Sequence, residues 1–361
     1  MNTYIRIVLT LCFGFASFVS HGATKNIIMF IASGTSSEHI KAASYYWYGQ
    51  DTMFNFQKFP HKSNLLTEDY LGQVADPSAA ATSMSTGVKT KAGSIGIDHL
   101  GRSRKNLFEY CRENGVATGL ISTTPLYEGF SAGFSSHSEL AEDKDFIIRS
   151  ILLDSKPNIL LGSSAGFSME WAEYRGYEVI GERKELKRFS WDEVSLLSGQ
   201  FGTEDYLSWE NETGVDEPKL SEMTRKSIEL LSKQKDGFFL LVDSGNIASA
   251  GHNSNLLRVV EELKGLENSV QEAIDFAKSR NDTLVLVAGD VETGGLEVMD
   301  SNGIQEIPSH QWTSRVINNW RMNTKRTVPL YILGDLKSPL ALEQNNSVVF
   351  DIVTENLGFE Q

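Results

Sequence analysis

Short apolar runs that recur along this chain constrain its fold more than any other feature. Each run is a few residues long and most of its residues are apolar, chiefly Val, Ile, Leu and Phe, as expected of a strand buried on both sides. The runs cover residues 27–31, 117–122, 158–161, 237–242, 283–288 and 328–333. Amphipathic helical patterns lie between them, for example over 219–233 and 256–280. This alternation predicts an α/β fold with a central, largely parallel sheet and helices on both faces.

The loops that follow these strands are where functional side chains are expected. Parallel strands end at a common edge, and open α/β sheets bind ligands beyond the carboxyl ends of their strands. The loops to inspect are therefore residues 33–34, 123–130, 243–252 and 290–295.

The N-terminal residues 1–22 have the pattern of a signal peptide. Arg6 precedes an apolar run from Ile7 to Val19, and the small residues Ser20 and Gly22 follow it. We therefore expect an exported protein, periplasmic or secreted, whose mature domain covers residues 23–361. Within it, residues 168–216 have a weaker pattern and are interpreted as an accessory segment. No later apolar stretch is long enough to span a membrane.

Charge and cysteine content exclude some classes of function. The formal net charge is −14, whereas a nucleic-acid partner needs a basic face that releases counterions. No nucleic acid is therefore expected as a partner. The mature chain keeps one cysteine, Cys111, and so can form no intramolecular disulfide.

One segment resembles a known family. Residues 74–90, VADPSAAATSMSTGVKT, and the following GSIGID at 93–98 are similar to the nucleophile region of alkaline phosphatases. Further similar segments follow in the family's order over most of the mature chain. The resemblance implies a three-layer α/β/α fold, hydrolysis of phosphomonoesters by a serine nucleophile, two zinc ions and one magnesium ion, and commonly a homodimer.

The nucleophile position departs from the family pattern. Where the family has serine after the aspartate, this chain has Pro77 after Asp76. Asp76 as N-cap and Pro77 as first helical residue suit a helix start. Ser78 is the candidate for a relocated nucleophile, but successive side chains on a helix are rotated by roughly 100°, so its hydroxyl is expected to point elsewhere.

Most of the metal ligands implied by the resemblance are replaced. The replacing residues are Ser33, Phe130, Ala248, Val291 and Asn323. The side chains that remain as candidate metal ligands are Glu128, Asp243, His252 and Asp290. Because structural zinc needs about four N, O or S ligands, neither zinc site is complete.

These departures favour a pseudoenzyme of the family, with a binding or structural role and no cofactor expected. Its partner is an unidentified protein or small-molecule ligand. The first alternative is a phosphomonoester hydrolase whose rebuilt metal site uses Asp243, His252 and Asp290 with zinc or magnesium. Separately from that site, Glu128 and Asp243 could hold one hard cation such as magnesium, with water completing the shell.

A second alternative is a serine esterase. Gly162-Ser-Ser-Ala-Gly166 follows a buried strand and fits the G-x-S-x-G pattern, with Ser164 as nucleophile. Asp290 and His310 follow later in the order that such hydrolases have. A tight glycine-containing turn explains the same residues without catalysis.

Overall fold

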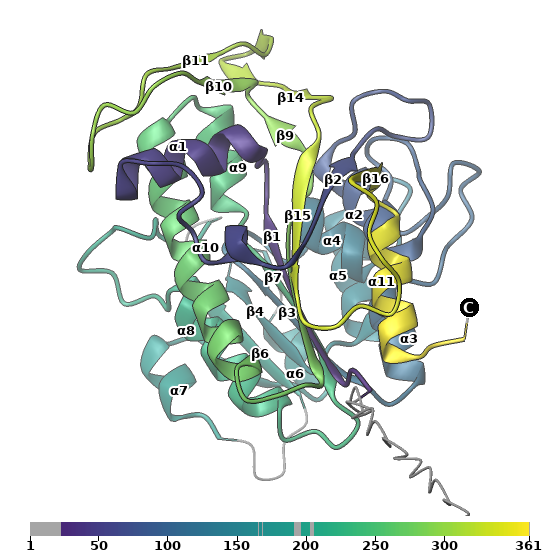
Figure 1. The fold of residues 1–361 in the computed structure, drawn as a ribbon. Helices are drawn as coiled ribbons and strands as arrows, with labels where there is room; N and C mark the ends of the chain where they lie inside the picture. Colours follow the sequence, from purple (N-terminus) through teal and green to yellow (C-terminus); the bar gives the residue numbers. More distant parts are fainter. Residues whose placement is uncertain (1–22, 165, 168, 191–195, 203–205, 361) are drawn as a thin grey trace, which may run out of the picture.

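A computed structural model describes residues 23–164, 166–167, 169–190, 196–202 and 206–360. The predicted signal peptide, residues 1–22, lies outside the described residues. Within these ranges the chain forms a large mixed sheet between two helical layers, as the sequence predicts (Figure 1).

The main sheet has ten strands in the order β16-β2-β15-β8-β1-β7-β3-β4-β6-β5. The strands are β1 (Asn26–Ala32), β2 (His61–Leu66), β3 (Ala117–Ser122), β4 (Ile159–Ser163), β5 (Glu178–Ile180), β6 (Leu197–Phe201), β7 (Phe238–Asp243), β8 (Thr283–Gly289), β15 (Val328–Leu333) and β16 (Glu343–Asn345). All neighbouring pairs are parallel except those that include β15. The prediction of a largely parallel sheet is therefore confirmed.

Strand β15 is antiparallel because of how the chain reaches it. Between β8 and β15 only short strands are found: β9 (Glu292–Thr293), β10 (Leu296–Val298), β11 (His310–Trp312), β12 (Val316–Ile317), β13 (Trp320–Arg321) and β14 (Asn323–Thr324). We call residues 292–324 the crown segment, because they lie above the carboxyl ends of the central strands (Figure 1). In the described chain, no helix between β8 and β15 carries the chain back to the end of the sheet where β8 begins. Strand β15 therefore starts at the end where β8 stops, and it runs in the opposite direction.

Helices cover both faces of the sheet. They are α1 (Ser37–Tyr48), α2 (Pro77–Thr86), α3 (Leu107–Glu113), α4 (Gly129–Ser135), α5 (Lys144–Ser150), α6 (Met169–Tyr174), α7 (Arg183–Arg188), α8 (Leu220–Leu231), α9 (Asn246–His252), α10 (Leu256–Ala277) and α11 (Val348–Leu357). Helices α1, α8, α9 and α10 share one apolar cluster with the sheet, whereas α2, α3, α4 and α11 share the other. Figure 1 shows these two groups on opposite sides of the central strands.

The side chains of each central strand point alternately to the two faces of the sheet, so the strand packs against both helical layers. In β1, Ile28 and Phe30 belong to the cluster under α10, while Ile27 and Met29 belong to the cluster under α2 and α3. All are fully buried. Successive side chains of a strand point to opposite faces, so one apolar run supplies both cores.

The segment at 168–216 contributes β5 and β6 to the far edge of this main sheet. Its described parts also include α6 and α7.

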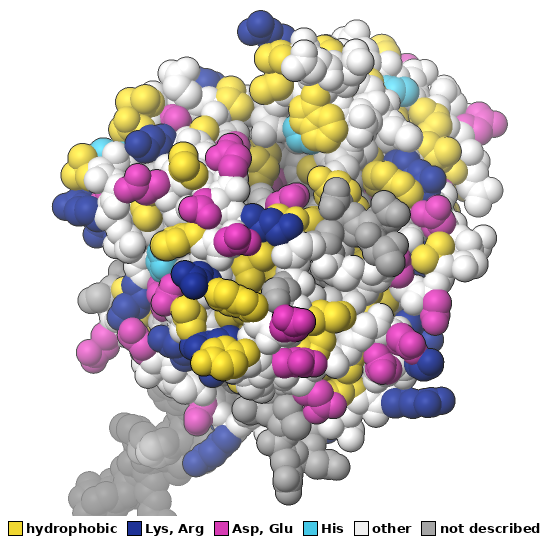
Figure 2. Space-filling model, turned by 180° about the vertical axis from the view of Figure 1, so that it is seen from behind, with side chains coloured by type: hydrophobic (Ala, Val, Ile, Leu, Met, Phe, Trp, Pro, Cys, Tyr) yellow, Lys and Arg dark blue, Asp and Glu magenta, His cyan; other side chains and the backbone are white. Residues whose placement is uncertain are grey.

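Among the described residues, no helix is long and apolar enough to cross a bilayer. On the face seen from behind, basic side chains lie singly or in small groups among acidic and apolar ones (Figure 2).

Candidate functional site

The carboxyl ends of β8, β1, β7 and β3 meet at the edge beneath the crown segment. The register places Asp243, at the end of β7, opposite Ile31 of β1 and opposite Ser122 of β3. Ser33 follows β1 directly, and Asp290 follows β8. Four polar side chains from sequence positions far apart are thereby brought to one edge.

Asp243 is enclosed by serine hydroxyls. Ser33 Oγ donates to Oδ1 over 2.7 Å, while Ser122 Oγ and Ser131 Oγ each donate to Oδ2 over 3.1 Å. Burial raises the pKa of Asp243, and these hydrogen bonds act against that shift by stabilising the charged form. Each oxygen of this buried carboxylate therefore accepts at least one hydroxyl proton.

Asp290 is buried with only one oxygen bonded. Its Oδ1 accepts hydrogen bonds from the backbone N–H groups of Gly34 at 2.7 Å and Val291 at 2.6 Å. Among the residues that the structure describes, its Oδ2 has no hydrogen-bond partner. Burial raises the pKa of Asp290 to about 7, and the nearby charge of Asp243 acts in the same direction.

The backbone of Gly34 can approach Asp290 because the residue is glycine. Its φ is +75°, and a Cβ built there would lie 2.9 Å from Cα of Ala248. Any other residue would strain this turn and push α9 away from β1. The local sequence thus fixes the contact between the end of β1 and the loop after β8.

His252 closes the same edge from the end of α9. Its Nδ1 donates to the carbonyl oxygen of Arg321, and its ring stacks on Trp320 with centroids 4.3 Å apart and planes inclined by 15°. With Nδ1 protonated, the other ring nitrogen, Nε2, carries a lone pair. Burial lowers the pKa of His252, which favours this neutral form.

A cavity of about 140 Å³ lies at this edge, beside Ser33, Asp243 and His252. The residues that line it are Ser33, Pro77, Thr124, Glu128, Gly129, Phe130, Tyr206, Asp243, Gly245, Ala248, Ser249, His252 and Trp320. Of the predicted metal ligands, Glu128, Asp243 and His252 line this cavity. Asp290 does not line it, but contacts the backbone next to Ser33.

The start of α2 presents Pro77 to the cavity. Asp76 caps the helix, with Oδ1 accepting from Ala79 N at 2.9 Å and Oδ2 accepting from Gly93 N at 2.8 Å. Ser78 is buried, and its hydroxyl lies 3.5 Å from the carbonyl oxygen of Gly129. Ser78 is not among the residues that line the cavity.

Several residues of the site were not predicted from sequence. Tyr206 and Trp320 line the cavity from the segment after β6 and from the crown segment. Ser122 and Ser131 bind Asp243. A serine at a strand end or in a helix carries no signal by itself. The register of β3 beside β7 reveals the partner of Ser122, and the position of α4 reveals that of Ser131.

Ser164, the candidate esterase nucleophile, lies after β4. Its Oγ donates to the carbonyl oxygen of Gly202 over 2.5 Å. His310 contacts the carbonyl oxygen of Pro308 through Nδ1. In the described part of the chain, no hydrogen bond joins Ser164 to His310 or Asp290.

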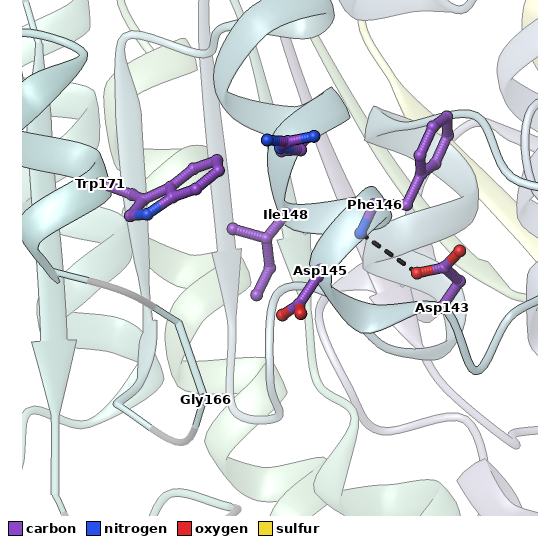
Figure 3. Close-up of a pocket in the computed structure, with 7 residues that line it drawn as sticks. Asp143, Asp145, Phe146, Ile148, Gly166 and Trp171 are labelled. Atoms are coloured by element: carbon purple, nitrogen blue, oxygen red, sulfur yellow. Dashed lines mark hydrogen bonds between the residues drawn. The ribbon is translucent and has the colours of Figure 1, made fainter.

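A larger cavity, of about 540 Å³, lies away from this edge beside α5 and α6. Figure 3 shows Ile148 and Asp145 near Trp171 in this cavity. The guanidinium of Arg149 lies over the Trp171 ring, 5.0 Å from its centroid. None of the predicted catalytic or metal-binding residues lines this cavity, so the smaller cavity is the candidate functional site.

The donors at the strand ends do not fit two zinc ions. Both oxygens of Asp243 accept serine hydroxyl protons, and the other candidate donors, namely the Glu128 carboxylate, Oδ2 of Asp290 and Nε2 of His252, come singly from different elements. Zinc binds about four N, O or S donors in a compact shell. Over the described ranges, no group of three or more His, Cys, Asp or Glu side chains is placed to hold a metal ion.

The fold and the site define a three-layer α/β/α protein with its candidate cavity at the carboxyl ends of the central strands. A family model described as alkaline phosphatase matches residues 24–151 and 166–356, so this chain belongs to the alkaline phosphatase family. The resemblance seen in the sequence is thereby confirmed.

Curated relatives agree with this assignment. Alkaline phosphatase 3 of Bacillus subtilis is 30% identical over 295 residues, which are 76% of this chain and 62% of that protein. Alkaline phosphatase 4 of the same organism is 28% identical over 293 residues, with the same coverage. The chain thus spans about 62% of the length of these two relatives.

Solved structures show the same fold. A cold-active alkaline phosphatase from Shewanella sp. superposes with a TM-score of 0.80 at 20% identity, covering 92% of this chain and 99% of that one. Thermus thermophilus alkaline phosphatase gives a TM-score of 0.80 at 19% identity, covering 98% and 96%. At these identities the likeness establishes the fold alone.

Proposed function

We propose that this chain is a catalytically silent alkaline phosphatase homologue with a binding or structural role. The observation that carries the proposal is the set of hydrogen bonds at Asp243. The hydrogens of three serine hydroxyls carry partial positive charge and stabilise this buried carboxylate, as a cation would otherwise do. A metal ion at Asp243 would compete with these hydroxyl groups for the lone pairs of the carboxylate.

The start of α2 supports the same proposal. Phosphoryl transfer through a covalent intermediate needs a nucleophilic atom at the helix start, and a proline ring offers none. Pro77 lines the cavity at this place, and Ser78 is directed to the backbone of Gly129. The helix start therefore keeps its structural role without a side-chain nucleophile facing the cavity.

Three further expectations belong to this proposal. The protein is exported, as a periplasmic or secreted protein, after removal of residues 1–22. It requires no metal cofactor. It forms a homodimer, as expected from the family resemblance.

An assay of phosphomonoester hydrolysis tests the proposal. The mature chain is incubated with 4-nitrophenyl phosphate and added Zn²⁺ and Mg²⁺, and no release of nitrophenol above the buffer rate is expected. The Pro77→Ser variant restores a hydroxyl at the helix start and is expected to be equally inactive, because the ligands that would hold metal ions beside it remain absent. Turnover that disappears in Ser78→Ala would show that catalysis had moved to Ser78.

One observation favours a second candidate, a phosphomonoester hydrolase with a rebuilt metal site. Oδ2 of Asp290 is buried without a partner, and Nε2 of His252 carries a lone pair at the same edge. Together with Asp243 these groups could bind a single cation. Metal-dependent turnover that is lost in Asp290→Asn would establish this candidate in place of the first.

A further inference from the structure

The candidate cavity is lined by groups that disfavour an anion. Among the described residues that line it, Glu128 and Asp243 carry carboxylates, and there is no lysine or arginine. A phosphate dianion placed there would lie beside carboxylates, with no lysine or arginine among the described lining residues, and like charges repel in a partly buried site. The neutral His252 contributes only an acceptor nitrogen.

Aromatic rings line the same cavity. Phe130, Tyr206 and Trp320 all contribute to its wall, and His252 stacks on Trp320. The faces of aromatic rings carry partial negative charge and attract ammonium groups within about 6 Å of the ring centroid. Carboxylates and ring faces in one cavity both favour a positively charged occupant.

The cavity has room for a small group. Its volume is about 140 Å³, whereas a cavity needs roughly 10–15 Å³ on the same scale to hold one water molecule. A substituted ammonium group of several non-hydrogen atoms is of suitable size.

We propose that this cavity binds a small organic cation, an ammonium or methylated ammonium group, held by Glu128 and by the Trp320 ring. This inference rests on the proposed function, because an active phosphatase would keep metal ions and a phosphate group at the same place. The replacements in the site have reversed the charge of the ligand that it accepts.

Isothermal titration calorimetry on the mature protein tests this inference with matched probes. (2-Hydroxyethyl)trimethylammonium chloride is compared with its neutral isostere 3,3-dimethylbutan-1-ol and with inorganic phosphate, at constant pH and ionic strength. We expect the cation to bind at least tenfold more tightly than either. Equal affinity for the two isosteres, or tighter binding of phosphate, would overturn the proposal.

Variants locate the binding site. Glu128→Gln removes the charge at constant size, and Trp320→Leu removes the ring, and each is expected to weaken binding of the cation at least tenfold. Glu139→Gln, at an exposed glutamate, and Trp171→Leu, in the cavity beside α5, are matched controls that should change affinity by less than twofold. Unchanged affinity in both cavity variants, with melting temperatures like the native chain, would contradict the proposal.

The same samples separate the two proposals. If the native chain hydrolyses 4-nitrophenyl phosphate with added metal ions, the proposed function is wrong, whatever the titration shows. If it is inactive and the cation still does not bind, the proposed function stands and only the assignment of the ligand fails.

Discussion

The carboxyl group of Asp290 lies where its charge is poorly stabilised. One oxygen accepts hydrogen bonds from two backbone N–H groups, the other has no partner within the described part of the chain, and the side chain is fully buried. Burial raises the pKa of Asp290 from its ordinary value of 3.8 to about 7. The folded protein therefore holds a proton that the unfolded chain has already released above pH 4 or so.

This proton gives the stability of the protein a dependence on pH. Because the folded state binds the extra proton, the contribution of Asp290 to the free energy of unfolding falls as pH rises from about 4 to about 7 and is constant above that. Asp290→Asn stays neutral and removes this contribution. Urea unfolding from pH 4.5 to 8 should therefore show the native chain losing stability relative to Asp290→Asn across that window.

The control for this measurement is the exposed Asp300. Asp300→Asn should follow the native profile at every pH, since its carboxyl is exposed at the surface. Parallel profiles for the native chain and Asp290→Asn would mean that Asp290 is ionised in the folded state across the whole range.

Between elements, a histidine ties the start of α3 to the loop after α4. His137 Nε2 lies 3.0 Å from Glu109 Oε2, and its Nδ1 contacts the carbonyl oxygen of Gly96 at 2.8 Å. Although burial opposes it, the interaction with Glu109 raises the pKa of His137, and the same pair lowers the pKa of Glu109. Both side chains are mostly buried, so solvent screens the pair only partly.

Replacement of His137 should cost stability mainly at low pH. A group whose pKa is raised on folding contributes its full stabilisation below its unfolded pKa, near 6.5, and loses it as pH rises through the folded pKa. We expect His137→Gln to lower the free energy of unfolding by about 1.5–3 kcal/mol at pH 6 and by less at pH 9. Chemical unfolding at both pH values checks this, with the exposed His99→Gln as control; an equal loss at both would show that His137 is neutral in the fold.

The elements that the sequence predicts correctly are those whose burial is uniform. Strands β1, β3, β7 and β8 are buried along their whole length, so their apolar runs are continuous. Strand β2 was not predicted, because it lies near an edge and alternates between buried and exposed residues in the polar sequence His61-Lys-Ser-Asn-Leu-Leu66. Burial on a single face leaves too few apolar residues to mark a strand.

The same reasoning limits what sequence reveals of the site. Asp243 and His252 could be singled out because they follow a recognisable strand in the family's order. Ser131 and Trp320 could not, because their role depends on α4 and the crown segment lying beside β7 and α9. Pairing between distant segments is fixed by the sheet order and by packing, which no local pattern records.

At the scale of the whole molecule, two apolar clusters on either side of the sheet hold the fold, and the proposed function assigns no structural role to a metal ion. The clusters draw residues from nearly every major element, and the acidic edge between them is stabilised by hydrogen bonds to Asp243 and Asp290. A ligand that binds only the folded state stabilises it by mass action. If the chain binds no structural metal, added metal ions should not raise its stability and a chelator should not lower it.

Removal of metal ions should therefore leave the melting temperature unchanged. We expect the mature protein, dialysed against EDTA, to melt within about 1 °C of the untreated protein in differential scanning calorimetry, whereas a domain held by tightly bound zinc loses much of its stability when the ion is removed. Elemental analysis of the untreated protein should find less than one zinc per chain. If EDTA clearly lowered the melting temperature and added zinc restored the original value, Asp290 and His252 would hold a metal ion. The hydrogen bonds from serine hydroxyls to Asp243 would then need a different assignment of their protons.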